Sequence, residues 1–242
     1  MAKELFEGSC KHGRAELAKW FYENNRHIYI DKNTLFYEAC NNGHLDVARL
    51  LYEICEEIGN PVVIDNICFA TACSHGHLNI AKWLYEIGDE SVDRSDIAIF
   101  ETVCSKGYLE LAKWLYHSGE IDIHANSEQA FIGSCENGHF KVAKWLYGID
   151  PVLIHSQHEK AFRLACVNGH IHIARWLYDL DGQVNIHECK EEAFRWSCTN
   201  GYLEIAQWLY KVGIETGDPV NINICNEEAF SHACENGHFE IV

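Results

Sequence analysis

Residues 192–210, E-A-F-R-W-S-C-T-N-G-Y-L-E-I-A-Q-W-L-Y, form one of eight related copies in this chain of 242 residues. In each copy a Phe is followed four residues later by a Cys, and a Gly stands three residues beyond the Cys. The eight glycines are Gly13, Gly43, Gly76, Gly107, Gly138, Gly169, Gly201 and Gly237. Successive glycines are 30, 33, 31, 31, 31, 32 and 36 residues apart. A repeat of this period predicts a solenoid of stacked units.

Each copy encodes two short helices, so the predicted fold class is all-α. In the first helix, expected at 191–200 in the seventh copy, Phe194, Ser197 and Cys198 share one face because they stand at i, i+3 and i+4. The pair Ser156 and Glu159 fits a capping box at such a helix start. The Asn-Gly pairs that follow are stop signals. The second helix, L-x-I-A-K-W-L-Y at 78–85, 109–116 and 203–210, is apolar on most sides and must be covered by neighbouring copies.

These features resemble the ankyrin repeat. In that family's T-P-L-H-x-A-A-x-x-G-H pattern, residues 192–195 fall on T-P-L-H and residues 197–198 on A-A. Gly-His stands intact at 43–44, 76–77, 138–139, 169–170 and 237–238. Copies with A-F-R-x-A-C-x-N-G-H and A-K-W-L-Y are similar to the ankyrin families of giant DNA viruses of amoebae. The resemblance covers nearly the whole chain and implies a scaffold that binds proteins.

The chain departs from the ankyrin pattern where that family forms its hairpins. T-P is missing almost throughout, and D-x-x-G is not kept at residues 124–127 or 155–158. Irregular hairpin loops are therefore expected.

We expect one array over residues 1–242, with its eighth unit incomplete after Val242. The array is then a fragment of a longer one, or its last surface is covered by another chain; otherwise a monomer is expected. Trp208 in the seventh unit is expected to face the incomplete neighbour. Residues 3–6 already belong to a predicted helix, so no secretory leader is expected. No apolar run approaches the length of a membrane span, so no membrane partner is expected.

Neither the 12 cysteines nor the 15 histidines form a known metal-ligand pattern, so no metal or cofactor is predicted. Eight cysteines stand one per copy, too far apart for disulfides between adjacent helices, and are expected to be buried thiols in a reducing, cytoplasmic compartment. Cys189 and Cys225 are expected in exposed loops. The turn histidines are expected to form hydrogen bonds between adjacent loops. No catalytic motif is present, so no catalytic residue is assigned and the chain is not expected to be an enzyme.

The charge balance, 19 Lys and Arg against 36 Asp and Glu, gives −17 and argues against a nucleic-acid partner. It suits a basic protein partner, although a charged surface that keeps the array in solution explains it equally simply.

Ankyrin proteins bind partners with their hairpin tips and the concave side of their first helices. By alignment to that family, the binding residues of this chain are Arg94, Ser95, Asn126, Glu128, Glu136, Asn137, Gln157, Glu159, Asn168, Glu188, Glu191, Trp196 and Thr199. They would form an acidic, polar surface. Trp196 is either an interface anchor or part of the packing between repeats.

The favoured hypothesis is a non-enzymatic scaffold that binds a host protein through its concave face, as a host-targeting adaptor. Two alternatives stay open. One is a self-assembling array that uses the open C-terminal unit. The other is a metal-binding or enzymatic protein that uses loop His and Cys residues.

Overall fold

The computed structural model describes residues 2–26, 31–88, 92–150, 153–181 and 184–241, and this part of the chain is all-helical, without a strand. Its fifteen helices are α1 (Ala2–Lys11), α2 (Ala15–Asn24), α3 (Lys32–Asn41), α4 (Leu45–Glu57), α5 (Asn66–Ser74), α6 (Leu78–Ile87), α7 (Ile97–Ser105), α8 (Leu109–Ser118), α9 (Ala125–Glu136), α10 (Phe140–Ile149), α11 (Ser156–Val167), α12 (Ile171–Asp181), α13 (Glu188–Thr199), α14 (Leu203–Thr216) and α15 (Ile224–Glu235). Odd-numbered helices are the first helices of the repeats and even-numbered helices the second. The predicted pairing of helices is confirmed.

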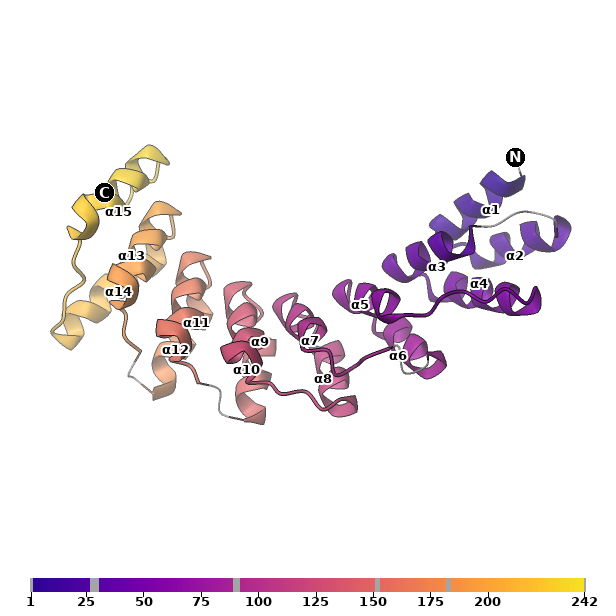
Figure 1. Cartoon of the computed structure of the whole chain (residues 1–242). Coiled ribbons are helices and arrows are strands. Elements are labelled where there is room, and N and C mark those ends of the chain that lie inside the picture. Colours follow the sequence, from indigo (N-terminus) through magenta and orange to yellow (C-terminus); the bar gives the residue numbers. More distant parts are fainter. Residues whose placement is uncertain (1, 27–30, 89–91, 151–152, 182–183, 242) are drawn as a thin grey trace. The chain divides into compact units, whose positions relative to one another are not determined.

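The helices form two compact units. Unit 1 comprises Met1–Ile99 with Glu110–Ile121, and unit 2 comprises Phe100–Leu109 with Asp122–Val242. In unit 1, α1 lies beside α3, α3 beside α5, and α2 beside α4 (Figure 1). In unit 2, α9, α11, α13 and α15 follow one another as neighbours, while α10, α12 and α14 pack on the first helices of their own repeats. Within each unit, therefore, a first helix contacts both its own second helix and the next first helix.

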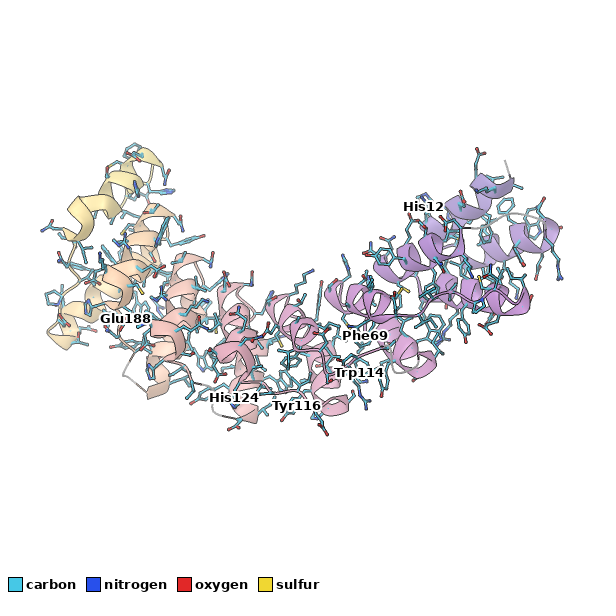
Figure 2. The ribbon with its side chains drawn as sticks, in the orientation of Figure 1. His12, Phe69, Trp114, Tyr116, His124 and Glu188 are labelled. Carbon is cyan, nitrogen blue, oxygen red and sulfur yellow. The ribbon has the colours of Figure 1, made fainter. Side chains whose placement is uncertain are left out.

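A Trp on the second helix packs against aromatic side chains of the preceding repeat. In unit 2 the ring of Trp208 lies 6.1 Å from Phe162 and 5.7 Å, edge-on, from Tyr178. In unit 1 Trp114 lies 6.3 Å from Phe69, as Figure 2 shows, and 6.1 Å from Tyr85. Each such aromatic pair contributes about 0.5–1.5 kcal/mol beyond its buried area. The expectation that Trp208 faces the eighth repeat is wrong, because its ring turns back toward the sixth.

Helix α5 and the first residues of α7, which belong to unit 1, begin at aspartate caps. The carboxylate of Asp65 accepts hydrogen bonds from the backbone N–H groups of Ile67 and Cys68, at 3.1 and 3.0 Å. Asp96 accepts from the N–H groups of Ala98 and Ile99, at 2.9 and 3.3 Å. These bonds satisfy donors that a helix start leaves without partners.

In six of the turns, the Gly leaves space for a side chain of the next repeat. Gly138 has φ of +79°, and a Cβ there would lie 2.6 Å from Cε1 of His170. Both the left-handed backbone and this close approach require glycine. In unit 1, the ring Nε2 of His77 lies 2.9 Å from the carbonyl oxygen of Asn41 in the preceding turn. The predicted hydrogen bond between adjacent loops is thus confirmed there.

The second helices begin where the sequence predicts, and two of them run further. Helix α14 begins at Leu203 and continues to Thr216, ending at Gly217 with φ of +80°. Helix α4 runs further too: it has 13 residues, against 10 in α6. The long connections after these helices are therefore partly helical.

Removing an aromatic ring from this packing should lower the stability of unit 2. We expect Phe162→Ala, at a side chain 1 % exposed, to lower the free energy of unfolding by about 3–5 kcal/mol, because it leaves a cavity beneath Trp208. Trp20→Ala, at a Trp 54 % exposed, is the control and should change it by less than about 1 kcal/mol. Urea unfolding followed by circular dichroism measures both. Equal losses in the two variants would contradict the packing described above.

Candidate functional site

The turns that lead into the first helices of unit 2 have an unusual backbone. Asn126, Ser127 and Glu128 have φ/ψ of 50/37°, 57/54° and 69/28°, three consecutive left-handed residues without a glycine. Residues 157–159 and 189–191 repeat this conformation. Each such residue costs roughly 1–2 kcal/mol, so one turn costs about 3–6 kcal/mol. The expected irregular loops are confirmed, and each needs bonds that hold it.

A buried carboxylate supplies these bonds. Glu128 is 1 % exposed, and its Oε1 lies 2.8 Å from Nδ1 of His124 and accepts a hydrogen bond from the backbone N–H of Leu153 at 3.1 Å. Glu191 repeats the arrangement with His187 at 2.8 Å and the N–H of Asn221 at 3.1 Å. Two hydrogen bonds to a charged group contribute about 3–6 kcal/mol, which is comparable to the cost of the turn.

The motif occurs in three consecutive repeats and is termed the His–Glu clasp. Its members are His124–Glu128, His155–Glu159 and His187–Glu191. In the first and third clasps the carboxylate joins a first helix to the chain segment that leads into the next repeat. The bond to Glu128 raises the pKa of His124, and the nearby Asp150 acts in the same direction.

The expectation that Glu128, Glu159 and Glu191 form an acidic surface is wrong. Their exposures are 1 %, 6 % and 4 %, because the left-handed turn directs each carboxylate inward to its His. The capping box predicted at Ser156 and Glu159 is also wrong, since Glu159 binds the ring of His155, 2.7 Å away, and α11 has no side-chain cap bond. Sequence reasoning missed the signal H-x-x-x-E-x-A-F, which stands at residues 124–131, 155–162 and 187–194.

One stripe of each first helix lies opposite its Phe and Cys. Positions i, i+3, i+4, i+7 and i+8 share a helix face. Counted from Gln129, Lys160 and Glu192, these positions form what we term the first-helix surface of unit 2. Its solvent-accessible members are Gln129, Glu136, Asn137, Lys160, Arg163, Leu164, Val167, Asn168, Glu192, Arg195, Trp196 and Asn200. Because α9, α11 and α13 are neighbours, the three stripes adjoin.

The first-helix surface carries both charge signs and one large exposed ring. The guanidinium of Arg163 forms an ion pair with Glu192, which joins α11 to α13. Trp196 is 41 % exposed, whereas Gly133 and Leu164 occupy the equivalent positions on α9 and α11. Five predicted residues lie on these stripes: Glu136, Asn137, Asn168, Trp196 and Thr199. Thr199 is buried, with 9 % of its surface exposed. The surface is polar and mixed in charge, and Trp196 on α13 is its large exposed apolar side chain.

Three other predicted residues lie at the turns and contact adjacent repeats. The side-chain amide of Asn126 donates to Glu101 at 2.7 Å. That of Gln157 donates to the carbonyl of Ser127 at 3.1 Å. The carboxylate of Glu188 lies 3.7 Å from Nδ1 of His158. These turns border the first-helix surface.

Two predicted residues, Arg94 and Ser95, belong to unit 1, whereas the other eleven belong to unit 2. The guanidinium of Arg94 stacks 4.3 Å from the centre of the Tyr85 ring. Ser95 donates to Asp93 from both its N–H and its hydroxyl. Both residues line a groove of about 560 Å³.

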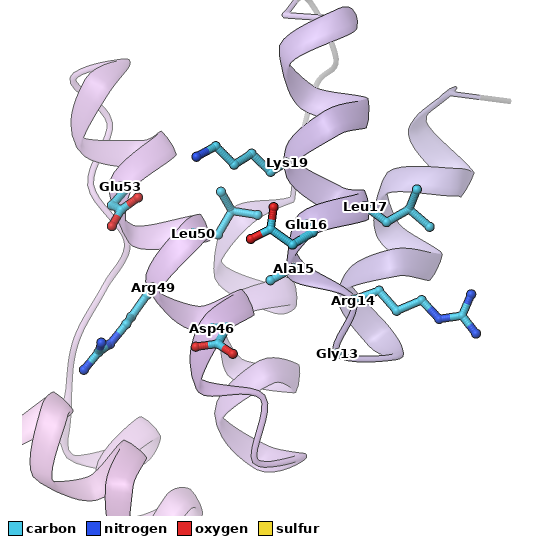
Figure 3. Close-up of a pocket in the computed structure, with 10 residues that line it drawn as sticks. All are labelled: Gly13, Arg14, Ala15, Glu16, Leu17, Lys19, Asp46, Arg49, Leu50 and Glu53. Atoms are coloured by element: carbon cyan, nitrogen blue, oxygen red, sulfur yellow. The ribbon is translucent and has the colours of Figure 1, made fainter.

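A second groove of unit 1, of about 520 Å³, lies between α2 and α4 (Figure 3). Glu16 and Lys19 of α2 and Asp46 of α4 lie toward the space between the helices in Figure 3. Arg14, Arg49 and Glu53 also line the groove, and the side chains of the two arginines extend away from its middle. The two signs alternate, so the groove holds no concentration of charge that would select a charged ligand.

The cysteines of the described part are free thiols, and most are buried. Burial raises the pKa of Cys73 to about 12 and also raises that of Cys135. Cys189 is exposed, as expected, while the side chain of Cys225 lies outside the described residues. Among those residues, no group of three or more His, Cys, Asp or Glu side chains is placed to hold a metal ion. No helix there is sufficiently long and apolar to cross a membrane.

A family model described as ankyrin repeats (3 copies) matches residues 7–96, 99–189 and 132–218. The chain belongs to the ankyrin-repeat family. The crystal structure of the human ASB11 ankyrin repeat domain is similar, with a TM-score of 0.56 and 15 % identity over 94 % of this chain and 96 % of that one. At this identity the likeness concerns the fold alone. No curated protein matches the sequence.

Removing a clasp carboxylate should destabilise unit 2. We expect Glu191→Ala to lower the free energy of unfolding by about 2–3 kcal/mol, because the left-handed turn and the N–H of Asn221 lose their acceptor. Glu188→Ala removes a neighbouring, partly exposed carboxylate and should change it by less than about 1 kcal/mol. Urea unfolding compares the two. A loss at Glu188 as large as that at Glu191 would refute the role given to the clasp.

Thiol reactivity should follow burial. We expect iodoacetamide at pH 8 to modify Cys189 in the folded protein and to leave Cys73 and Cys135 unmodified, because burial keeps their thiolate fractions very small. Peptide mass spectrometry before and after denaturation measures the modification. Rapid modification of Cys135 in the folded chain would contradict its burial.

Proposed function

We propose that this protein is a non-enzymatic scaffold that binds a partner protein on the first-helix surface of unit 2, with Trp196 as its anchor. Ankyrin repeats are generally protein–protein interaction modules, and their fold is typically non-enzymatic. The supporting observation is the 41 % exposure of Trp196 on a polar helix surface. A partly exposed Trp among polar residues is the kind of side chain that contributes most to binding energy in interfaces.

The same proposal extends to the whole chain. We propose that the eight repeats of residues 1–242 act as one array, since the Phe, Cys and Gly period continues from Phe6 to Gly237. Unit 1 then contributes Arg94 and Ser95, and the turns of unit 2 contribute Asn126, Gln157 and Glu188.

The partner that we propose is a host protein in the cytoplasm, so that the scaffold acts as a host-targeting adaptor. The likeness of the A-F-R-x-A-C-x-N-G-H and A-K-W-L-Y copies to the repeats of giant DNA viruses supports a host partner. The net charge of −17 favours encounter with a basic protein through the field of the whole chain. It does so without an acidic patch at Glu128, Glu159 and Glu191, since these three glutamates are buried.

A capture experiment with three full-length baits tests this function. The baits are the natural chain, Trp196→Ala, and Trp20→Ala, which removes an exposed Trp of unit 1. We expect a protein from an amoebal lysate to be retained by the first and third baits and lost from the second. With that protein purified, Trp196→Ala should weaken the Kd by at least about 30-fold, the effect of a hot-spot residue. If all three baits retain the same proteins, binding does not use the first-helix surface.

A further inference from the structure

His124 and His187 each lie between two carboxylates. Nδ1 of His124 is 2.8 Å from Glu128 and its Nε2 is 3.3 Å from Oδ2 of Asp150. Nδ1 of His187 is 2.8 Å from Glu191 and its Nε2 is 3.4 Å from Oδ2 of Asp218. An ionised carboxylate only accepts hydrogen bonds, so both ring nitrogens of His124, each hydrogen-bonded to a carboxylate, must donate. Only the imidazolium form carries two N–H groups, whereas neutral imidazole carries one.

Glu128 has a further need for a cation. The second oxygen of Glu128 is buried and has no hydrogen-bond partner in the described part of the chain. A buried carboxylate with one oxygen unsatisfied is costly unless an opposite charge lies beside it. The imidazolium of His124 supplies that charge.

Solvent reaches the histidines while the inner glutamates are closed to it. The side chains of His124 and His187 are 36 % and 23 % exposed, against 2 % and 6 % for Glu128 and Glu191. His187 and Asp218 also line a groove of about 210 Å³. Protons can therefore be exchanged at the rings without unfolding the turn.

The charged groups around each ring come from the turn and from the following second helix. Beside His124 stand Glu128 and Asp122 of its own turn and Asp150, which follows α10; Asp122 accepts the backbone N–H of His124. Beside His187 stand Glu191 of its own turn and Asp218, which follows α14. All five groups are acidic, and Glu128 and Asp150 favour the protonated ring of His124.

We propose that His124 is a pH-sensitive latch: its imidazolium fastens the turn that leads into α9 to the segment that enters the next repeat, and the neutral ring releases it. The latch ties three segments, because Glu128 also accepts the N–H of Leu153. Deprotonation removes at least one of the two ring bonds and leaves Glu128 without its cation. The turn then opens while the aromatic packing of the repeats persists.

The pH range follows from the direction of the shift. The pKa of His124 is raised in the folded chain, chiefly by its bond to Glu128. Its stabilisation is therefore complete below the unfolded pKa of about 6.5 and is lost as pH rises through the higher folded value. The latch is closed below the unfolded pKa and opens as pH rises through the folded pKa of His124.

Amide hydrogen exchange and histidine NMR on the full chain test this proposal. The probe is the amide of Leu153, which donates to Glu128. The control is the amide of Ile67 in unit 1, which donates to Asp65. Between pH 6 and 9, after correction for the intrinsic exchange rate, protection of Leu153 should fall, because the latch opens as His124 loses its proton. Protection of Ile67 should stay constant.

Two variants assign the effect. In His124→Gln, protection of Leu153 should be low and independent of pH. Asp150→Asn keeps the bond to Glu128, so it tests the latch even if the first variant folds poorly; its His124 midpoint should move down toward about 6.5. The proposal is overturned if the natural His124 ring titrates at or below about 6.5, or if protection of Leu153 does not change with pH.

Discussion

The dependence of each second helix on the repeat before it is the constraint from which the rest of the structure follows. A helix such as α14 is too apolar to stand alone, and Trp208 finds its contacts on Phe162 and Tyr178 of the preceding repeat. The Gly of the turn lets adjacent repeats approach closely, since Gly138 leaves space for the ring of His170. The buried Phe and Cys of the first helices from α1 to α13 complete a core that is shared between neighbours.

The two units start their first helices by different chemistry. In unit 1, Asp65 and Asp96 cap helices by accepting N–H groups of their own first turn. In unit 2, Glu128 and Glu191 accept a ring N–H and an N–H from the next repeat. The aspartate caps form bonds within their own helix start, whereas the glutamates form bonds that join neighbouring repeats. The turns of unit 2 are thus part of the contact between repeats as well as the border of its first-helix surface.

The repeat, the helix pairs and the buried faces could be predicted because they depend on spacing alone: Phe194 and Cys198 recur at helical intervals. The clasp could not, because Glu128, Glu159 and Glu191 stand where the ankyrin pattern places exposed tips. Their burial depends on three left-handed residues that no helical or strand periodicity expresses. Trp196 could be singled out because it differs from its equivalents in other repeats, but its exposure depends on how α13 meets its neighbours. The direction in which Trp208 turns could not be predicted either, because the repeat pattern does not say whether a side chain packs on the preceding or on the following repeat.

That direction has a consequence for synthesis on the ribosome. Because Trp114 packs on Phe69 and Trp208 on Phe162, the aromatic contacts of a newly made repeat lie on sequence that has already emerged. A nascent repeat can therefore dock as soon as its second helix leaves the exit tunnel, without waiting for residues still to be translated. Folding of this kind proceeds one repeat at a time from the N-terminus and keeps little unassembled apolar surface exposed at any moment.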